Sequence, residues 1–421
     1  MLIHIILLIH ITKQSPLIIP FIKESLKEKN NFYSYFTKNN ISTLIEIGTP
    51  YQKIPFYIKL DEFPISILGN KNKGKYNEIK SNTYNKEEEC DYYFYKGNFE
   101  GCISNDIFNI KNEKIKFSFL LINNHSIESQ MDNNIFGLTF YSRRFSGQQF
   151  IYLLKNNKII DSYNFYFKYN EKDENGNLII GNFPHEIDKN YDEKLLKLIN
   201  LNIKNNEFLW KFSIDEIYFD DKIINEKNFI EIKIDIKGII GTEKYNQYFK
   251  SNFIDKNNNK CQIDFSEDKK YKFYYCDKNV DISKLKIIKF NSKVFNSSFE
   301  FNHKDLWIEF NEKLYYQIIF KNFILNNEND NNWIFGELFL KKYLLLFNQD
   351  KKVIGIYENK KMNFPFLIIL NIILVILVIV LGYYFKKFYK LKPRKLRVNE
   401  LEENYDYTSY NNPKIKNESI I

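Results

Sequence analysis

The chain has 421 residues, 44% hydrophobic and 17% aromatic, which is enough for two lobes with large β cores and excludes a disordered chain. The formal net charge is +9, but the lysines are spread through loops rather than gathered in a stripe, so we expect no nucleic-acid partner. There is no Gly-rich phosphate loop and no Ser-His-Asp nucleophile elbow, and we expect no cofactor.

The N-terminal segment from Leu2 to Ile11 is an apolar run of about ten residues. It is too short to cross a bilayer and has the length of the apolar part of a secretory signal. No clear basic stretch precedes it, and no small-residue cleavage site follows. We predict a signal peptide within residues 1–20 and leave its cleavage site open.

Two motifs stand at opposite ends of a long β-rich region. Residues 45–52 read Ile-Glu-Ile-Gly-Thr-Pro-Tyr-Gln and lead through an apolar strand to Asp61. Residues 333–343 read Trp-Ile-Phe-Gly-Glu-Leu-Phe-Leu-Lys-Lys-Tyr, and two short apolar stretches follow, up to Tyr357. Together they resemble the opening and closing strands of pepsin-like aspartic peptidases. The resemblance implies an all-β bilobal fold of two related β-barrel-like lobes with a cleft between them, here residues 33–185 and 186–358.

An internal repeat fits a fold made by duplication. Residues 133–138 read Asn-Asn-Ile-Phe-Gly-Leu, and residues 332–336 read Asn-Trp-Ile-Phe-Gly. In the family, a hydrophobic-hydrophobic-Gly turn follows each catalytic Asp and lies under it. The resemblance therefore gives Gly137 and Gly336 structural roles.

The resemblance makes Asp61 and Asp235 the candidate catalytic residues. Such a pair must face one water and share one proton, because two like charges so close cannot both ionise easily. In the family each Asp is followed by a hydroxyl residue and a glycine, which lets the backbone turn close to the pair. The triplets here are Asp61-Glu62-Phe63 and Asp235-Ile236-Lys237. Both hydroxyls and both glycines are lost.

Two lysines add to the departure from the family motif. The ammonium of Lys237, if it came near Asp235, would favour a charged carboxylate over a shared proton. A count without gaps from Pro50 puts Lys59 at the catalytic position, and Asp61 fits only with two extra residues.

Three interpretations of the aspartates stay open. We favour the first, in which both are solvated turn carboxylates in a degenerate cleft. The second is a working dyad, and the third is a metal-binding or other catalytic use. Tyr95, near the tip of the segment from Tyr92 to Cys102, resembles the tyrosine of the family's substrate-covering hairpin; alternatively it is an exposed hairpin aromatic.

The four cysteines allow three connectivities. We predict Cys90–Cys102 and Cys261–Cys276, because each pair falls within one lobe of the implied fold and the second matches a second-lobe disulfide of the family. A metal site is not expected, since the paired ligands lack Cys-x-x-Cys spacing and the histidines are scattered. Glycosylation sequons begin at Asn40, Asn124 and Asn296.

The segment 364–385 is apolar apart from Asn371 and is long enough to cross a bilayer as a helix. Seven lysines and arginines follow it between Lys386 and Arg397, whereas two lysines precede it, so the positive-inside rule places the tail 386–421 in the cytosol. The sequence thus predicts a single-pass type I protein of the secretory pathway or cell surface. Its β domain would be lumenal or extracellular.

The sequence predicts a membrane-anchored pepsin-like homologue that is catalytically impaired. Its cleft would bind a peptide or protein ligand through strand edges. The alternative is an active membrane-bound endopeptidase that cleaves peptide bonds at acidic pH through Asp61 and Asp235.

Overall fold

A computed structural model describes most of the chain up to Tyr357 and one helix beyond it. The described residues are 15–23, 32–37, 39–62, 65–70, 75–87, 90–94, 98–110, 113–125, 133–139, 149–170, 175–201, 209–219, 222–223, 228–257, 259–285, 287–293, 297–322, 332–357 and 373–383. Those up to 357 belong to one compact unit, and the helix 373–383 belongs to another. The two units are described separately.

The larger sheet runs through half of the first unit, and β6 pairs with β7 beside its main path. In spatial order its strands are β12 (Leu196–Asn200), β27 (Val353–Tyr357), β26 (Leu345–Asn348), β10 (Asn164–Tyr169), β11 (Gly176–Ile180), β1 (Leu17–Lys23), β2 (Ile41–Ile47), β3 (Gln52–Lys59), β9 (Ile135–Gly137), β4 (Ser66–Leu68), β8 (Glu113–His125), β7 (Asn98–Ile110), β5 (Asn85–Lys86) and β6 (Asp91–Phe94). We call the six strands from β12 to β1 the connecting sheet, and β2 to β9 the first lobe.

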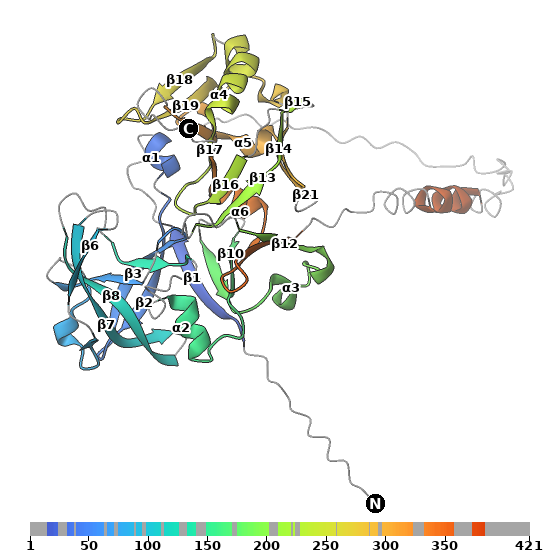
Figure 1. The fold of residues 1–421 in the computed structure, drawn as a ribbon. Helices are drawn as coiled ribbons and strands as arrows, with labels where there is room; N and C mark the ends of the chain where they lie inside the picture. The colour runs from blue at the N-terminus through green and yellow to red at the C-terminus, as the bar shows by residue number, and fades with distance from the viewer. Residues whose placement is uncertain are drawn as a thin grey trace, which may run out of the picture. The chain divides into compact units, whose positions relative to one another are not determined.

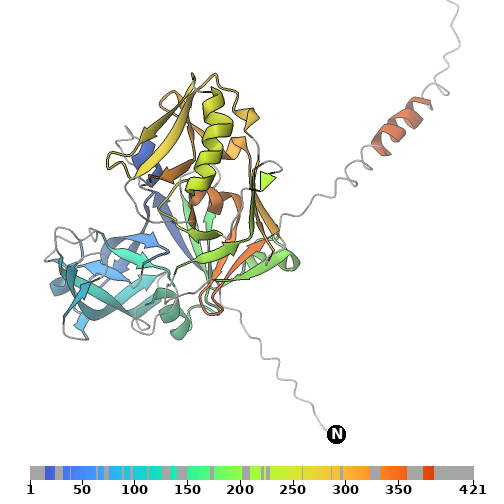
Figure 2. The same cartoon turned by 45° about the horizontal axis from the view of Figure 1, so that its top comes forward.

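Two further sheets form the second lobe, which comprises β13 to β25. One contains β13 (Lys211–Ile214), β16 (Asn228–Ile232), β25 (Asn332–Phe335), β17 (Ile239–Gly241), β24 (Ile318–Lys321), β19 (Tyr271–Asp277), β23 (Lys313–Tyr316), β22 (Trp307–Phe310) and β18 (Cys261–Phe265). The other contains β15 (Lys222–Ile223), β14 (Glu216–Phe219), β20 (Ile288–Ser292) and β21 (Ser297–Phe301). In Figures 1 and 2 the first lobe (blue to teal) and the second lobe (yellow to orange) lie on either side of β1 and β10.

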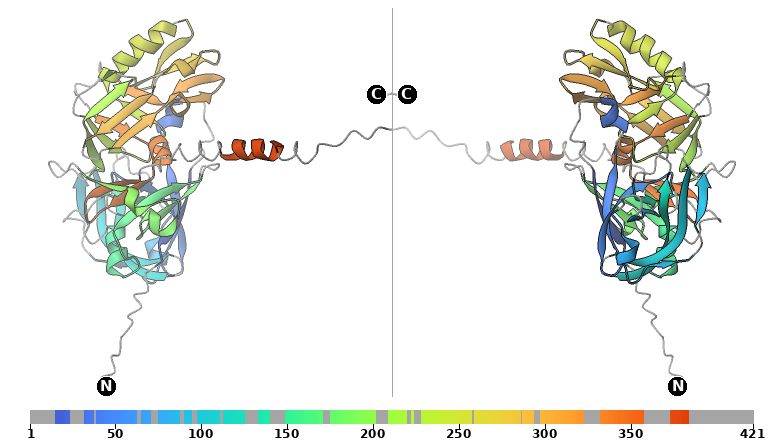
Figure 3. Two further views of the ribbon diagram at one scale, coloured as in Figure 1. Left: turned by 90° about the vertical axis from the view of Figure 1, so that its right-hand side faces the viewer. Right: turned by 90° about the vertical axis from the view of Figure 1, so that its left-hand side faces the viewer.

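The helices are short and lie around the strands. They are α1 (Phe32–Thr37), α2 (Phe150–Asn156), α3 (Pro184–Ile187), α4 (Glu243–Phe249), α5 (His303–Leu306) and α6 (Glu337–Lys342). A π-helical turn, Lys250–Ile254, prolongs α4, and the side views of Figure 3 show this helix at the far end of the second lobe. The described structure is therefore mostly β, as predicted.

The first strand begins earlier than the sequence predicted for the folded domain. β1 pairs with β11 and with β2, and its buried residues Leu17, Ile19 and Phe21 alternate with exposed ones. β1 overlaps residues 17–20 of the predicted signal peptide, whose cleavage site the sequence leaves open, and lies before residue 33, the predicted start of the first lobe. The alternation of buried and exposed residues along β1 is the period of two expected of a strand.

The second unit contributes the helix 373–383, whose side chains are exposed. Within the described parts of the chain, no helix is both long and apolar enough to span a membrane. The predicted span, 364–385, lies outside the described residues except for this helix.

Candidate functional site

An Ile-Phe-Gly turn lies next to the end of β3 in the first lobe, and a second one lies next to the end of β16 in the second lobe. In the first lobe β9 runs parallel to β3, and the Leu138 N–H donates to the Lys59 carbonyl at 2.8 Å. In the second lobe β25 runs parallel to β16, and the Gly336 N–H donates to the Gly238 carbonyl at 2.9 Å. A Cβ at Gly336 would lie 2.0 Å from the Ile236 carbonyl oxygen, so only glycine fits under this loop.

The strand registers show which residues correspond in the two lobes. The first-lobe pairs are Tyr57 with Ile135, Ile58 with Phe136 and Lys59 with Gly137. The second-lobe pairs are Glu231 with Ile334 and Ile232 with Phe335. Because both turns read Ile-Phe-Gly, Lys59 and Lys233 occupy equivalent positions at the ends of β3 and β16.

Each lysine reaches the aspartate of the other lobe. The Lys59 Nζ lies 3.0 Å from the Asp235 Oδ2, and the Lys233 Nζ lies 3.1 Å from the Asp61 Oδ2. The four side chains are between 13% and 29% exposed, so the pairs are only partly screened by solvent. We call these four residues the crossed pairs.

Lys233 faces more than one carboxylate. Its ammonium also lies 3.1 Å from the Glu231 Oε1. Burial disfavours its charge, but the carboxylates of Asp61, Glu231 and Asp235 outweigh burial and raise the pKa of Lys233 above its ordinary range. It therefore stays protonated at neutral pH.

The structure places Asp61 and Asp235 two residues beyond the equivalent lysines. Each faces an ammonium from the opposite lobe. The ammonium at Asp235 belongs to Lys59, whereas that of Lys237 lies 3.4 Å from the centre of the Tyr35 ring. The sequence reasoning missed the role of Lys233. Its signal was a repeated triplet, Lys-Leu-Asp at 59–61 and Lys-Ile-Asp at 233–235.

The segment that contains α1 covers the second-lobe loop carrying Asp235. The Lys237 N–H donates to the Phe36 carbonyl at 2.9 Å, and the Asn39 N–H donates to the Asp235 carbonyl at 3.1 Å. The Asn39 side chain also donates to the Ile234 carbonyl at 2.8 Å. The main chains of Phe36 and Asn39 thus take up hydrogen-bonding groups of the loop that carries Asp235.

Aromatic packing fixes α1 to the second lobe. The Phe32 ring stacks on Tyr315, with centroids 4.2 Å apart, and also contacts Phe273 at 5.4 Å. A Cβ at Gly238 would lie 2.3 Å from the Phe36 ring, so this glycine makes room for the helix. Although α1 lies between two strands outside the second lobe, β1 and β2, it packs on the second lobe.

The predicted disulfides and hairpin are present. Cys90 bonds Cys102, and Cys261 bonds Cys276. β6 and β7 form an antiparallel hairpin with Phe94 opposite Asn98. Tyr95 lies outside the described residues.

The sequons differ in their surroundings. Asn40 is half-buried, and Ser42 of the same sequon is buried in β2. Asn124 lies in β8, where it pairs with Glu100 of β7. Asn296 lies outside the described residues.

A buried ion pair outside the crossed pairs, between Lys23 and Glu337, was not predicted from the sequence. The Lys23 Nζ, at the end of β1, lies 2.5 Å from the Glu337 Oε1, and both side chains are 4% exposed. Burial favours the neutral carboxyl, but Lys23 and Lys341 outweigh it and lower the pKa of Glu337. This contact ties β1 to the helix that follows Gly336.

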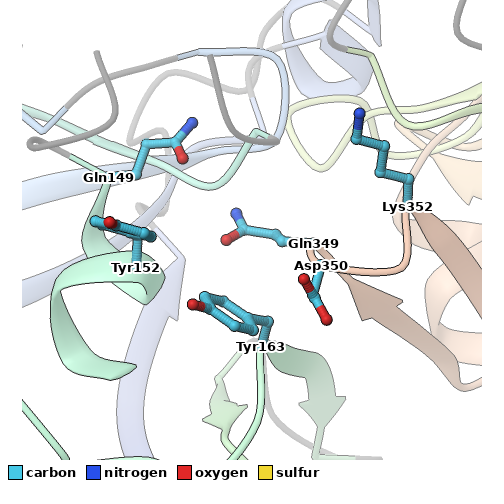
Figure 4. Close-up of a pocket in the computed structure, with 6 residues that line it drawn as sticks. All are labelled: Gln149, Tyr152, Tyr163, Gln349, Asp350 and Lys352. Carbon is cyan, nitrogen blue, oxygen red and sulfur yellow. The ribbon is translucent and has the colours of Figure 1, made fainter. Parts of the chain in front are cut away.

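One pocket lies apart from the crossed pairs. Its volume is about 270 Å³, and Figure 4 shows its lining residues: Gln149, Tyr152, Tyr163, Gln349, Asp350 and Lys352. The Gln349 side chain donates to the Thr139 carbonyl at 2.6 Å. The pocket therefore adjoins the segment just after the first-lobe turn.

Comparison with known families agrees with this geometry. The model of the eukaryotic aspartyl protease family matches residues 43–359. The match covers both lobes and most of the connecting sheet. The chain belongs to the eukaryotic aspartyl protease family, whose pepsin-like members it resembled in sequence. No individual curated protein matches it.

Proposed function

We propose that this protein is a catalytically impaired member of its family whose ectodomain binds a peptide or protein ligand. The observation that carries the proposal is the presence of lysines at both equivalent strand ends. Each is paired across the lobes with an aspartate 3.0–3.1 Å away.

The crossed pairs oppose aspartic-peptidase chemistry for a geometric reason. The family's reaction needs two carboxylates around one water, with one proton between them. Here ammonium groups take the space next to both carboxylates. A misplacement of about 1 Å in a reacting group can already cost on the order of a hundredfold in rate.

A ligand would bind between the β6–β7 hairpin and the covered second-lobe wall. Strand edges bind extended peptides through main-chain hydrogen bonds. Because Phe36 and Asn39 already use such groups at Lys237 and Asp235, we expect the ligand to contact the first lobe and the outer side of α1.

We propose that the protein is a single-pass type I protein of the secretory pathway or cell surface. Two intramolecular disulfides fit an oxidising compartment. The apolar segment 364–385 and the basic residues after it fit a membrane span with a cytosolic tail.

The test is an assay of the full-length protein with a broad peptide library from about pH 3 to pH 7, where a dyad sharing one proton would work. Cleavage and binding are measured on the same library. We expect peptide binding without turnover. Turnover that disappears in both Asp61→Asn and Asp235→Asn would establish the alternative, an active acid endopeptidase. If the protein neither binds nor cleaves any peptide of the library, the peptide-binding role is refuted.

A further inference from the structure

The pocket shown in Figure 4 is built by three segments that are far apart in the sequence. One side consists of Gln149, the residue before α2, and Tyr152 within that helix. The other side consists of Tyr163, the residue before β10, and the turn 349–352 between β26 and β27. The six lining residues belong neither to the crossed pairs nor to the β6–β7 hairpin. The pocket is therefore a second candidate site.

Gln349 presents a hydrogen-bond acceptor to this pocket. Its side chain is 5% exposed, and its Nε2 donates to the Leu138 and Thr139 carbonyls at 3.3 and 2.6 Å. Because a carbonyl can only accept, these two contacts fix the orientation of the amide. Within the described parts of the chain, no group donates to the Gln349 Oε1. Figure 4 shows the amide pointing into the space bordered by Tyr152 and Tyr163. A ligand there would have to supply a donor.

Tyr163 presents a hydroxyl to the same space. Burial, together with Asp350 and Tyr152 nearby, raises the pKa of Tyr163, so its hydroxyl stays protonated. That hydroxyl makes no hydrogen bond to any other residue that the structure describes. The Gln349 N–H donates to the Tyr163 carbonyl at 3.3 Å, which holds the two residues next to each other. A ligand bound between them could thus donate to Gln349 and accept from Tyr163.

The charged residues of the pocket lie at its exposed edge. Asp350 and Lys352 are both exposed, and neither forms an ion pair among the described residues. Their charges are opposite, so the pocket as a whole favours neither an anion nor a cation. The more buried groups, Gln349 and Tyr163, are neutral. A charged group of a ligand would lose its water there without gaining a partner of opposite charge.

We propose that this pocket binds a single neutral sugar ring of the hexopyranose type. Sugar hydroxyls both donate and accept, so they match the Gln349 acceptor and the Tyr163 donor together. The carbon–hydrogen faces of the ring would pack against the tyrosine rings. The volume of about 270 Å³ is just below the range of about 300–1,000 Å³ that is usual for small-molecule sites, which suits one ring rather than a chain. An apolar ligand would leave both polar atoms without a partner.

The test measures binding of D-glucose, D-galactose, D-mannose and N-acetyl-D-glucosamine by saturation-transfer NMR. Full-length protein is treated to remove any N-glycans and is held in a detergent without a sugar headgroup. We expect saturable binding of at least one sugar, with a dissociation constant on the order of 1 mM for a ligand of about twelve heavy atoms. Methyl glycosides of the bound sugar then identify its source. Equal binding indicates the terminal ring of a glycan, and lost binding indicates a free monosaccharide.

Two variants place the sugar in this pocket. Tyr163→Phe removes only the hydroxyl and should weaken binding roughly fivefold. Tyr152→Ser removes a packing surface on α2 and should weaken binding about as much, which keeps the test decisive if Tyr163→Phe does not fold. The matched control is Tyr51→Phe, at a first-lobe tyrosine outside the pocket, and it should leave binding unchanged. Thermal melting checks that each variant is folded.

Three results would overturn the proposal. The first is no binding of any of the four sugars up to about 50 mM, far above the expected dissociation constant. The second is equal binding by the unmodified protein and by the folded variants at Tyr163 and Tyr152. The third concerns charge: Lys352→Met should change sugar binding by less than about twofold, because the ammonium is exposed. If L-alanine binds instead, and Lys352→Met abolishes its binding, the ligand is a zwitterion and not a sugar.

Discussion

The Lys59 ammonium lies 3.0 Å from the Asp235 carboxylate, although the two residues are 176 positions apart and belong to different lobes. Attraction between opposite charges therefore joins the two lobes at this point. Lys233 and Asp61 make the reciprocal contact. Each lobe thus contributes one ammonium and one carboxylate, so the charges balance between the lobes.

Removing Lys59 should destabilise the protein. We expect Lys59→Met to lower the free energy of unfolding by about 1–2 kcal/mol, because Asp235 is left partly buried without its ammonium. The double variant Lys59→Asp with Asp235→Lys should recover much of the loss seen in either single reversal. Denaturant unfolding of the four proteins in a double-mutant cycle measures the coupling.

The matched control for this cycle is Lys53→Met. Lys53 lies 3.7 Å from Glu46 but is 73% exposed, so its loss should cost less than about 0.5 kcal/mol. Strictly additive effects at Lys59 and Asp235 would mean that the two residues do not interact.

The buried Glu337 should make stability depend on pH. Because its folded pKa is lowered, its contribution is full above the unfolded value of about 4.3 and is lost as the pH falls through the folded pKa. At pH 7, Glu337→Gln should cost roughly 3 kcal/mol, since the Lys23 ammonium stays buried but loses the Glu337 carboxylate. The difference in the free energy of unfolding between the unmodified protein and Glu337→Gln should become smaller below about pH 4. A difference that stays constant from pH 7 to pH 3 would contradict the ion pair.

Gly336 should not tolerate a side chain. Gly336→Ala would drive a methyl group into the Ile236 carbonyl oxygen, and we expect a loss of at least about 3 kcal/mol or failure to accumulate folded protein. Gly69→Ala is the control, because the atom nearest to its Cβ is a leucine methyl carbon at 3.2 Å that can shift. Thermal melting distinguishes them; similar melting temperatures would show that the loop above Gly336 can move.

The disulfide Cys261–Cys276 closes a loop of 15 residues between paired strands. Replacing both cysteines by serine should cost about 3 kcal/mol in the chain-entropy model. Non-reducing peptide mapping of the unmodified protein should recover this pair and Cys90–Cys102. Recovery of a bridge between the two lobes would contradict the fold.

Membrane topology can be tested by protease protection. Protease added outside sealed vesicles of native orientation should release the β domain and leave the tail 386–421 intact. The asymmetric charge around the segment 364–385 is the reason for this expectation. A tail that is digested before the β domain would reverse the proposed orientation.

Local motifs allowed much of the fold to be predicted from the sequence. The repeated Ile-Phe-Gly turns and the cysteine spacing depend on neighbours in the chain, and both are where they were expected. The contacts of Lys23 with Glu337 and of α1 with the second lobe join distant segments, and no local pattern encodes them. β1 likewise pairs with β11, more than 150 residues further along the chain, and the sequence analysis did not predict this strand.

The catalytic positions show a different limit. The family motif drew attention to Asp61 and Asp235, because aspartate is the residue that the chemistry requires. The family motif does not lead one to expect a functional lysine at position 233. Lys233 is identified as the counterpart of Lys59 by comparing two parallel strand pairs, β3 with β9 and β16 with β25. Once the two lobes are compared, the Lys-aliphatic-Asp repeat is plain in the sequence.

The ion pair between Lys23 and Glu337 joins residues 314 positions apart, and this separation affects how the protein is made. At about 5–20 residues per second, a ribosome adds Glu337 roughly 15–60 s after Lys23. During that interval Lys23 cannot reach the Glu337 carboxylate, although β2 and β11, the strands that pair with β1, have already been made. The contact between β1 and α6 therefore forms only after nearly the whole first unit has been translated.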